Sequence, residues 1–220
     1  MVKILGDQNS VFNQFLAEAR DAVVQKDSMR FRKNMERMSE IFAYEISKSL
    51  LYEKKEINTQ LGSTEVSVLK EQPVIASVLR AGLAMHNGML NIFDHADNAF
   101  VSAYRHQHKS GKFDIDIEYC SCPDLHNRYL ILCDPMIATG ASMVLTYKKL
   151  MERGRPVHTH IAAIVSSVEG LDYLNKYIST SECTVWLGAL DDELTAQALI
   201  VPGLGDAGDL AFGSKLFAKE

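Results

Sequence analysis

The chain has 220 residues, 47% of them apolar and 23% charged, which is the composition of a globular protein with one sizeable core. A net charge of −5 and the lack of any Lys/Arg stripe argue against nucleic acid as the main partner, but leave room for a small anionic substrate. No apolar run approaches the ~18–20 residues that span a bilayer, and the N-terminus has no signal-peptide core, so we expect no membrane partner.

The first fifty residues predict two amphipathic helices, with Asn9 or Ser10 as the N-cap of the first. We expect residues 1–52 to form a helical N-terminal extension of a single domain, 1–220. Much of the apolar stripe of the second helix is expected to be buried against a second subunit, in a homodimer or higher homo-oligomer. The apolar positions at helical spacing are Phe12, Phe15, Leu16, Ala19 and Val23, then Phe31, Met35, Met38, Phe42, Ile46 and Leu50.

Beyond Glu65, continuous apolar runs alternate with helical patterns. This alternation predicts an α/β fold with a mainly parallel sheet and helices on both faces. The expected helices are 83–93, 141–154 and 168–178, with Gly154 as a C′ residue. The expected strands are 65–69, 73–79, 99–104, 129–134, 160–167 and 184–190.

Residues 105–128, RHQHKSGKFDIDIEYCSCPDLHNR, depart from this rhythm. The segment is polar, contains a Gly turn, and alternates briefly from Asp114 to Ile117. It predicts a β-hairpin arm that projects from the sheet. In an α/β enzyme such an excursion is a candidate lid over the site.

Histidine and cysteine spacing gives no strong metal signal. His158 and His160 lie in a predicted strand, where positions i and i+2 share a face. No third ligand at suitable spacing accompanies them or the pair His106/His108, so we expect surface or interface histidines. The four cysteines form no CxxC, which favours reduced thiols and a cytoplasmic location.

Three loops follow predicted strands, at the edge where parallel sheets bind ligands. The first, VLRAGLAM, has Arg80 at a strand end and Gly82 two residues later. The guanidinium can offer a fork of donors to phosphate oxygens. Alternatively, Arg80 pairs with a nearby carboxylate and Gly82 simply opens a helix.

The second loop, DPMIATGAS, joins a strand to a helix N-terminus, where unpaired N–H groups favour an anion. Asp134 would repel phosphate but can accept hydrogen bonds from sugar hydroxyls. The stretch therefore fits a sugar phosphate, although an ordinary Asp-Pro turn is the alternative. The third loop, residues 199–214, has glycines at 203, 205, 208 and 213, and its backbone groups suit a planar polar base.

Together the three motifs resemble the uracil phosphoribosyltransferase family, which implies a type I phosphoribosyltransferase-like fold. DPMIATGAS is similar to its phosphoribosyl pyrophosphate loop, LRAGL to its pyrophosphate loop, and IVPGLGDAGD…FG to its uracil signature. MSEIFAYEIS is similar to its N-terminal helix, so the resemblance runs from about Phe31 to Phe217.

The resemblance implies that phosphoribosyl pyrophosphate (PRPP) and uracil give UMP and pyrophosphate, a pyrimidine salvage reaction. It implies Mg²⁺ held mainly by substrate and water, with no metal ligands from the protein, and GTP as a candidate effector. Arg80, Arg105 and Asp206 are the expected catalytic residues, with Asp206 hypothesised to accept the uracil N1 proton. The expected uracil site is Ile200, Gly205, Asp206 and Ala207. The expected PRPP site is Arg80, Arg105, Asp134, Pro135, Met136, Ile137, Ala138, Thr139, Gly140, Ala141, Ser142 and Asp206.

The chain departs from the family pattern at Ile137, Ala141, Leu199 and Leu210, where Leu, Gly, an aromatic residue and Arg are usual. Ala141 is tolerated if its φ is helical and strained if its φ is positive. Two other functions remain open: a non-catalytic nucleotide-binding regulatory paralogue, and a phosphoribosyltransferase for another base.

Overall fold

The computed structural model describes residues 1–107 and 113–214, without the side chains of residues 104–107 and 113–116. An eight-stranded sheet forms its centre, in the order β1-β10-β9-β7-β4-β5-β6, with β8 beside β9. Every neighbouring pair is parallel except β5 and β6, which confirms the predicted mainly parallel sheet. The strands are β1 (Val2–Ile4), β4 (Val74–Leu79), β5 (Asp97–Gln107), β6 (Phe113–Ser121), β7 (Tyr129–Cys133), β8 (Met136–Ile137), β9 (His158–Ser167) and β10 (Cys183–Asp191).

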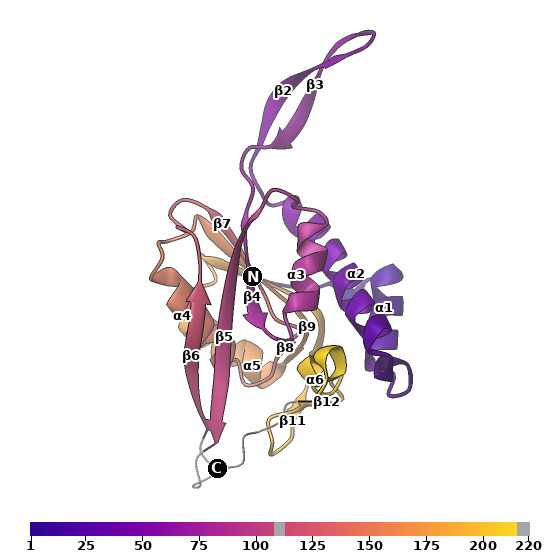
Figure 1. Ribbon diagram of the computed structural model, residues 1–220, viewed down its shortest axis with the longest axis vertical. Coiled ribbons are helices and arrows are strands. Elements are labelled where there is room, and N and C mark those ends of the chain that lie inside the picture. Colours follow the sequence, from indigo (N-terminus) through magenta and orange to yellow (C-terminus); the bar gives the residue numbers. More distant parts are fainter. Residues whose placement is uncertain (108–112, 215–220) are drawn as a thin grey trace.

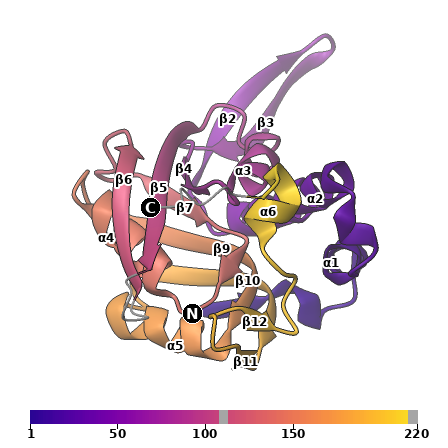
Figure 2. The same ribbon diagram turned by 60° about the horizontal axis from the view of Figure 1, so that its bottom comes forward.

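Helices cover both faces of this sheet, as predicted (Figure 2). Successive residues of β4 alternate between two apolar clusters: Ile75 belongs to one and Ala76 to the other. The first cluster is built with α1 (Val11–Arg20), α2 (Ser28–Ser47) and α3 (Leu83–Leu90), and the second with α4 (Ala141–Met151) and α5 (Val168–Tyr177). A short sixth helix, α6 (Ala207–Phe212), lies near the C-terminus. No helix in the described ranges is both long and apolar enough to cross a membrane.

The N-terminal segment is not entirely helical, contrary to our expectation. Residues Val2–Ile4 form β1 and pair with β10, and two 3-10 helices, η1 (Leu5–Asp7) and η2 (Val24–Lys26), flank α1. Ser10 caps α1 by accepting a hydrogen bond from the Phe12 N–H. Val23 lies beyond the helix and is exposed, so it does not belong to the apolar face.

The apolar stripe of α2 is buried within the chain itself. Phe31, Met35, Met38, Phe42 and Ile46 are all at most 1% exposed, and the Phe42 ring packs edge-on against Phe12. The expectation that this stripe faces a second subunit was therefore wrong. The stripe instead fixes α1 and α2 onto one face of the sheet.

The stretch 65–69 is a strand, but it does not join the central sheet. It lies in β3 (Gly62–Leu69), which pairs only with β2 (Tyr52–Thr59) among the described strands. Figure 1 shows this hairpin projecting away from the body of the molecule. Most of its residues are exposed, so no buried face marks its pattern in the sequence.

The hairpin expected within residues 105–128 is present as β5 and β6, with β6 as an edge strand of the central sheet. Its tip, residues 108–112, lies outside the described residues, as do the side chains of Arg105 and His106. α4 ends with Glu152 as its C-cap, so Gly154 lies two residues beyond the cap rather than next to it.

His158 and His160 share a face of β9, as predicted, but His160 is not a surface residue. It is 2% exposed, and its Nδ1 accepts a hydrogen bond of 3.1 Å from Trp186 Nε1. Burial, with smaller contributions from His158 and Lys3, lowers the pKa of His160 to about 3. The ring is therefore a neutral part of the core.

The buried ring at His160 predicts acid sensitivity. An unfolded histidine titrates near pH ~6.5, so between about pH 6.5 and the folded pKa the unfolded chain binds one more proton, and stability falls as the pH falls. His160→Gln, which keeps an acceptor for Trp186, should remove up to about 1.4 kcal/mol per pH unit from that slope. Urea unfolding at pH 7, 6, 5 and 4 measures it. His95→Gln, at a ring that is 82% exposed, is the control and should leave the slope unchanged.

Candidate active site

The parallel strands deliver three loops to one edge of the sheet. β4 leads into the Arg80 loop (residues 79–83), β7 into the Asp134 loop (134–142), and β10 toward the Gly-rich loop (199–214). The first two are in contact: a Cβ added to Gly82 would lie 2.8 Å from the carbonyl oxygen of Cys133. Only glycine therefore lets the Arg80 loop pass so close to the residue before Asp134.

An ion pair joins the Arg80 loop to the Gly-rich loop. Arg80 Nη2 lies 2.9 Å from Asp209 Oδ1, and Nη1 donates to the carbonyl oxygen of Gly213 at 3.2 Å. The carboxylate partner required by the alternative interpretation of Arg80 is thus present, and Gly82 does precede α3 as its N-cap. The Arg80 side chain nevertheless stays 39% exposed, although its Nε atom is buried.

The Asp134 loop has the shape expected of an anion site. Gly140 is the N-cap of α4 with a left-handed φ of 76°, and no acidic residue lies in the first turn of that helix. Thr139 Oγ1 accepts from the Ala141 N–H at 3.4 Å, and Asp134 Oδ1 accepts from the Met136 N–H at 3.3 Å. Ala141 is the first residue of α4 and its φ is not positive, so alanine is unstrained where the family has glycine.

Residues at the start of α5 hold the Asp134 loop in place. Ser167 Oγ donates to the carbonyl oxygen of Ala138 and accepts from the Gly170 N–H at 2.8 Å, which caps α5. Gly170 has no side chain because the carbonyl groups of Ile137 and Ala138 occupy that space. Residues of a separate element therefore fix the loop before any ligand binds.

The Gly-rich loop contains β12 (Ile200–Val201), which pairs with the preceding β11 (Glu193–Leu194), and then α6. Ile200 and Ala207 are buried, whereas Gly205 and Asp206 are exposed. Asp206 is the N-cap of α6 and accepts from the Asp209 N–H at 2.9 Å. The four residues expected to line uracil thus lie between the start of β12 and the start of α6.

Sequence reasoning missed several residues that assemble these loops. Asp209 pairs with Arg80 across 129 positions, and Arg20 pairs with Asp191 across 171. Ser167 was predicted only as the last residue of a strand, with no role in the site. Leu210, where the family has Arg, packs against the first apolar cluster, so an apolar contact stands where an ion pair was expected.

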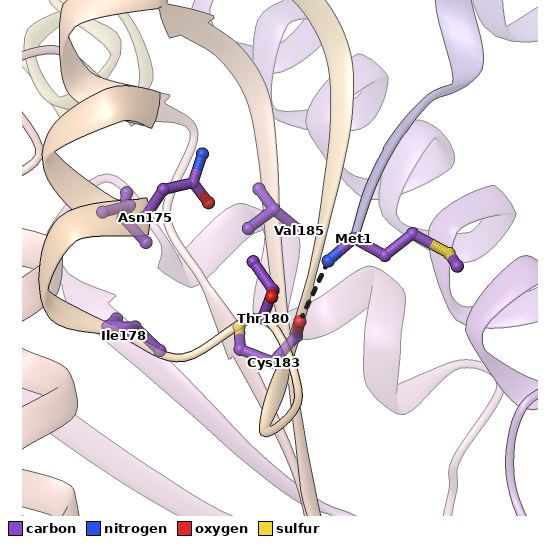
Figure 3. A pocket seen from close by; sticks show the side chains of 7 residues that line it. Met1, Asn175, Ile178, Thr180, Cys183 and Val185 are labelled. Atoms are coloured by element: carbon purple, nitrogen blue, oxygen red, sulfur yellow. Dashed lines mark hydrogen bonds between the residues drawn. The ribbon is translucent and has the colours of Figure 1, made fainter.

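Two cavities lie at the opposite, amino end of the strands. One of about 200 Å³ lies between Lys70, Asn127, Tyr129 and Val157. The other, of about 10 Å³, lies beside Met1, whose amino group donates to the carbonyl oxygen of Cys183 (Figure 3). The second cavity has room for one water at most. The candidate site is instead the open surface between the three loops.

Comparison with known sequences decides the family. The sequence model of the family described as uracil phosphoribosyltransferase matches residues 7–214. The chain belongs to this family. A uracil phosphoribosyltransferase of Porphyromonas gingivalis is 48% identical over 212 residues, which are 96% of this chain and 98% of that protein. One from Thermococcus gammatolerans is 34% identical over 92% of this chain and 89% of that protein.

Solved structures support the fold. The AQ2163 protein of Aquifex aeolicus superimposes with a TM-score of 0.86 over 99% of this chain and 100% of that chain, at 24% identity. An adenine phosphoribosyltransferase of Trypanosoma brucei reaches 0.54 over 90% of this chain and 87% of that chain, at 11% identity. The expected type I phosphoribosyltransferase fold is thereby confirmed.

Proposed function

We propose that this chain transfers the phosphoribosyl group of PRPP to uracil, giving UMP and pyrophosphate. The observation that carries the proposal is the Arg80–Asp209 ion pair, which joins the loop proposed to bind pyrophosphate to the loop proposed to bind the base. Family membership supports it. The test is incubation with uracil, PRPP and Mg²⁺: UMP and pyrophosphate should form in equal amounts, and no product would refute the proposal.

The reaction exchanges one bond at ribose C1 for another. The bond from C1 to pyrophosphate oxygen breaks, its electron pair leaves with pyrophosphate, and uracil N1 bonds to C1 as it loses its proton. Arg80 and Arg105 are proposed to stabilise the negative charge on the leaving pyrophosphate. Asp134 would accept hydrogen bonds from the ribose hydroxyls, and residues 138–142 would hold the 5′-phosphate through N–H and hydroxyl donors.

The residues present are compatible with a divalent ion that is carried by the substrate and not held by the protein alone. Within the described residues, no group of three His, Cys, Asp or Glu side chains could hold a metal. The carboxylates of Asp134 and Asp206 are hard oxygen acceptors that can bind the waters of a Mg²⁺ ion carried by the substrate. When bound, the ion would neutralise charge on the pyrophosphate.

The two alternatives make different demands on the site. A regulatory paralogue without catalysis would not need Arg80, Asp134 and Asp206 together, and all three are present at one edge of the sheet. A phosphoribosyltransferase for another base would differ in the Gly-rich loop. Leu199 stands where the family usually has an aromatic residue. Its side chain is 47% exposed, so it does not supply a buried apolar contact in place of the ring. Competition of uracil with other free bases measures the preference.

The hairpin of β5 and β6 is proposed as a lid, since β5 carries Arg105 two residues before its end at Gln107, close to the turn and not at the base where the arm was expected to start. A lid would exclude water, which at C1 would hydrolyse the donor. GTP is retained as a candidate effector, which is tested by measuring UMP formation with and without it.

A homo-oligomer is proposed from the uncovered β2–β3 hairpin, because an isolated two-stranded hairpin is marginally stable. Light scattering measures the mass of the particle in solution. A cytoplasmic location is proposed from the four free cysteines.

Replacing Asp206 by Asn should lower kcat about 100-fold if the carboxylate accepts the N1 proton, since general-base contributions are about 10²–10⁴-fold. Asparagine is also a good N-cap, so α6 and both substrate sites should stay intact. Steady-state kinetics with isothermal titration of both substrates tests this. Unchanged turnover with intact binding would remove Asp206 from the chemistry.

A further inference from the structure

Arg20, the last residue of α1, and Asp191, the last residue of β10, form an ion pair outside the three motifs. Arg20 Nη1 and Nη2 each donate to one oxygen of the Asp191 carboxylate, both at 2.8 Å. The Asp191 side chain is 7% exposed and that of Arg20 is 22% exposed. Burial acts to raise the pKa of Asp191, but hydrogen bonds from Arg20 and the Gly203 N–H outweigh it and leave the pKa below its ordinary value. The pair is therefore ionised and largely shielded from water.

This ion pair holds the backbone of Gly203 from both sides. Asp191 Oδ2 accepts from the Gly203 N–H at 2.8 Å, and Arg20 Nη1 donates to the Gly203 carbonyl oxygen at 2.9 Å. Gly203 is buried and has a left-handed φ of 58°, with the Ile200 carbonyl group where a side chain would lie. One charged pair thus fixes both polar atoms of a residue in a tight turn.

Gly203 lies in the middle of the segment that is proposed to bind the base. Ile200 lies three residues before it, and Gly205 to Ala207 begin two residues after it. Recognition of uracil through backbone N–H and C=O groups requires that those groups be held in place before binding. We propose that Arg20 and Asp191 are positioning residues for the base, acting through Gly203. This inference rests on the proposed reaction with uracil.

A second arginine anchors the other end of the same loop. Arg32, on α2, donates from Nη1 to the carbonyl oxygen of Ala211 at 2.6 Å. Figures 1 and 2 both show α6 beside α2. The N-terminal helices therefore hold the Gly-rich loop at two points, while the Asp134 loop is supported separately by α5. Loosening the support from the N-terminal helices should therefore affect binding of the base more than binding of PRPP.

The test compares Michaelis constants of Arg20→Gln and Asp191→Asn with those of Arg128→Gln. Arg128 is the matched control: its side chain is 21% exposed, it pairs with Glu71 and Asp97 at 2.9 and 3.0 Å, and it donates to the Gln72 carbonyl oxygen. We expect both test variants to raise KM for uracil about tenfold, with KM for PRPP changed less than about twofold. Arg128→Gln should change neither constant, whatever it does to the melting temperature.

Arg20→Lys completes the series, because lysine keeps the charge but not the fork. Its KM for uracil should lie between the wild-type and Arg20→Gln values. If Arg20→Gln does not fold, Arg20→Lys and Asp191→Asn decide by the same ratio of Michaelis constants. Equal changes in both constants, or changes no larger than those of Arg128→Gln, would overturn the inference. Absence of UMP formation by the wild type would instead refute the proposed function.

Discussion

Arg80→Gln is expected to lower the rate of UMP formation by about 100–1000-fold, the loss typical when one preorganised donor to a developing negative charge is removed. Arg80 is 39% exposed at the carboxyl end of β4, so its guanidinium can reach an anion held at that edge. The pyrophosphate gains charge as the C1–O bond breaks, so the arginine should contribute more in the transition state than in the bound substrate. Steady-state kinetics should therefore show most of the loss in kcat.

Asp209→Asn separates this role from a structural one. If Arg80 serves only to hold the Gly-rich loop through Asp209, removing either partner should reduce turnover by a similar factor. If Arg80 acts on the leaving group, Asp209→Asn should reduce turnover far less than Arg80→Gln, because the arginine remains. The turnover of Arg80→Lys should lie between those of Arg80→Gln and Asp209→Asn, since a single ammonium group replaces the two-pronged guanidinium. Similar losses in Arg80→Gln and Asp209→Asn would contradict direct action of Arg80.

The sequence allowed prediction of the central sheet and of the loops that carry the chemistry. β7, most of β4 and the middle of β9 are apolar because both faces of the sheet are covered, and such runs are visible without a structure. Arg80 and Asp134 were noticeable because each is a charged residue at the end of a buried strand, and Gly140 because it lies directly before a predicted helix. Each of these signals is local, because the residue lies within a few positions of the predicted strand or helix that marks it.

The elements that were missed lack such a local signal. β1 has three residues, too few to show a period, and β2 has no buried face to impose alternation. The pairs Arg20–Asp191 and Arg80–Asp209 join residues far apart in the chain, and either member alone resembles an ordinary surface charge. The stripe of α2 was recognised as apolar, but its partner was misassigned because periodicity shows that a face is buried and not what covers it.

Gly140→Ala should weaken PRPP binding while leaving uracil binding intact. Gly140 has a φ of 76°, and an added Cβ would lie 2.5 Å from the Gly170 carbonyl oxygen and 3.2 Å from Tyr173 Cβ. The left-handed conformation alone costs about 1–2 kcal/mol for an L-residue, or roughly 5–30-fold in affinity. The close contact adds to this, because the loop must move away from α5. Titration of PRPP into the variant measures the loss.

The neighbouring Ala141→Gly is the matched control, since it restores the residue usual in the family. Ala141 begins α4 and its φ is not positive, so glycine relieves no strain there and costs at most about 1 kcal/mol of helix stability. Its affinity for PRPP should equal that of the wild type. A gain in affinity with Ala141→Gly, or wild-type affinity with Gly140→Ala, would show that the loop takes another conformation when PRPP binds. The contrast between adjacent positions follows from one difference: Gly140 adopts a positive φ against α5, and Ala141 already belongs to the helix.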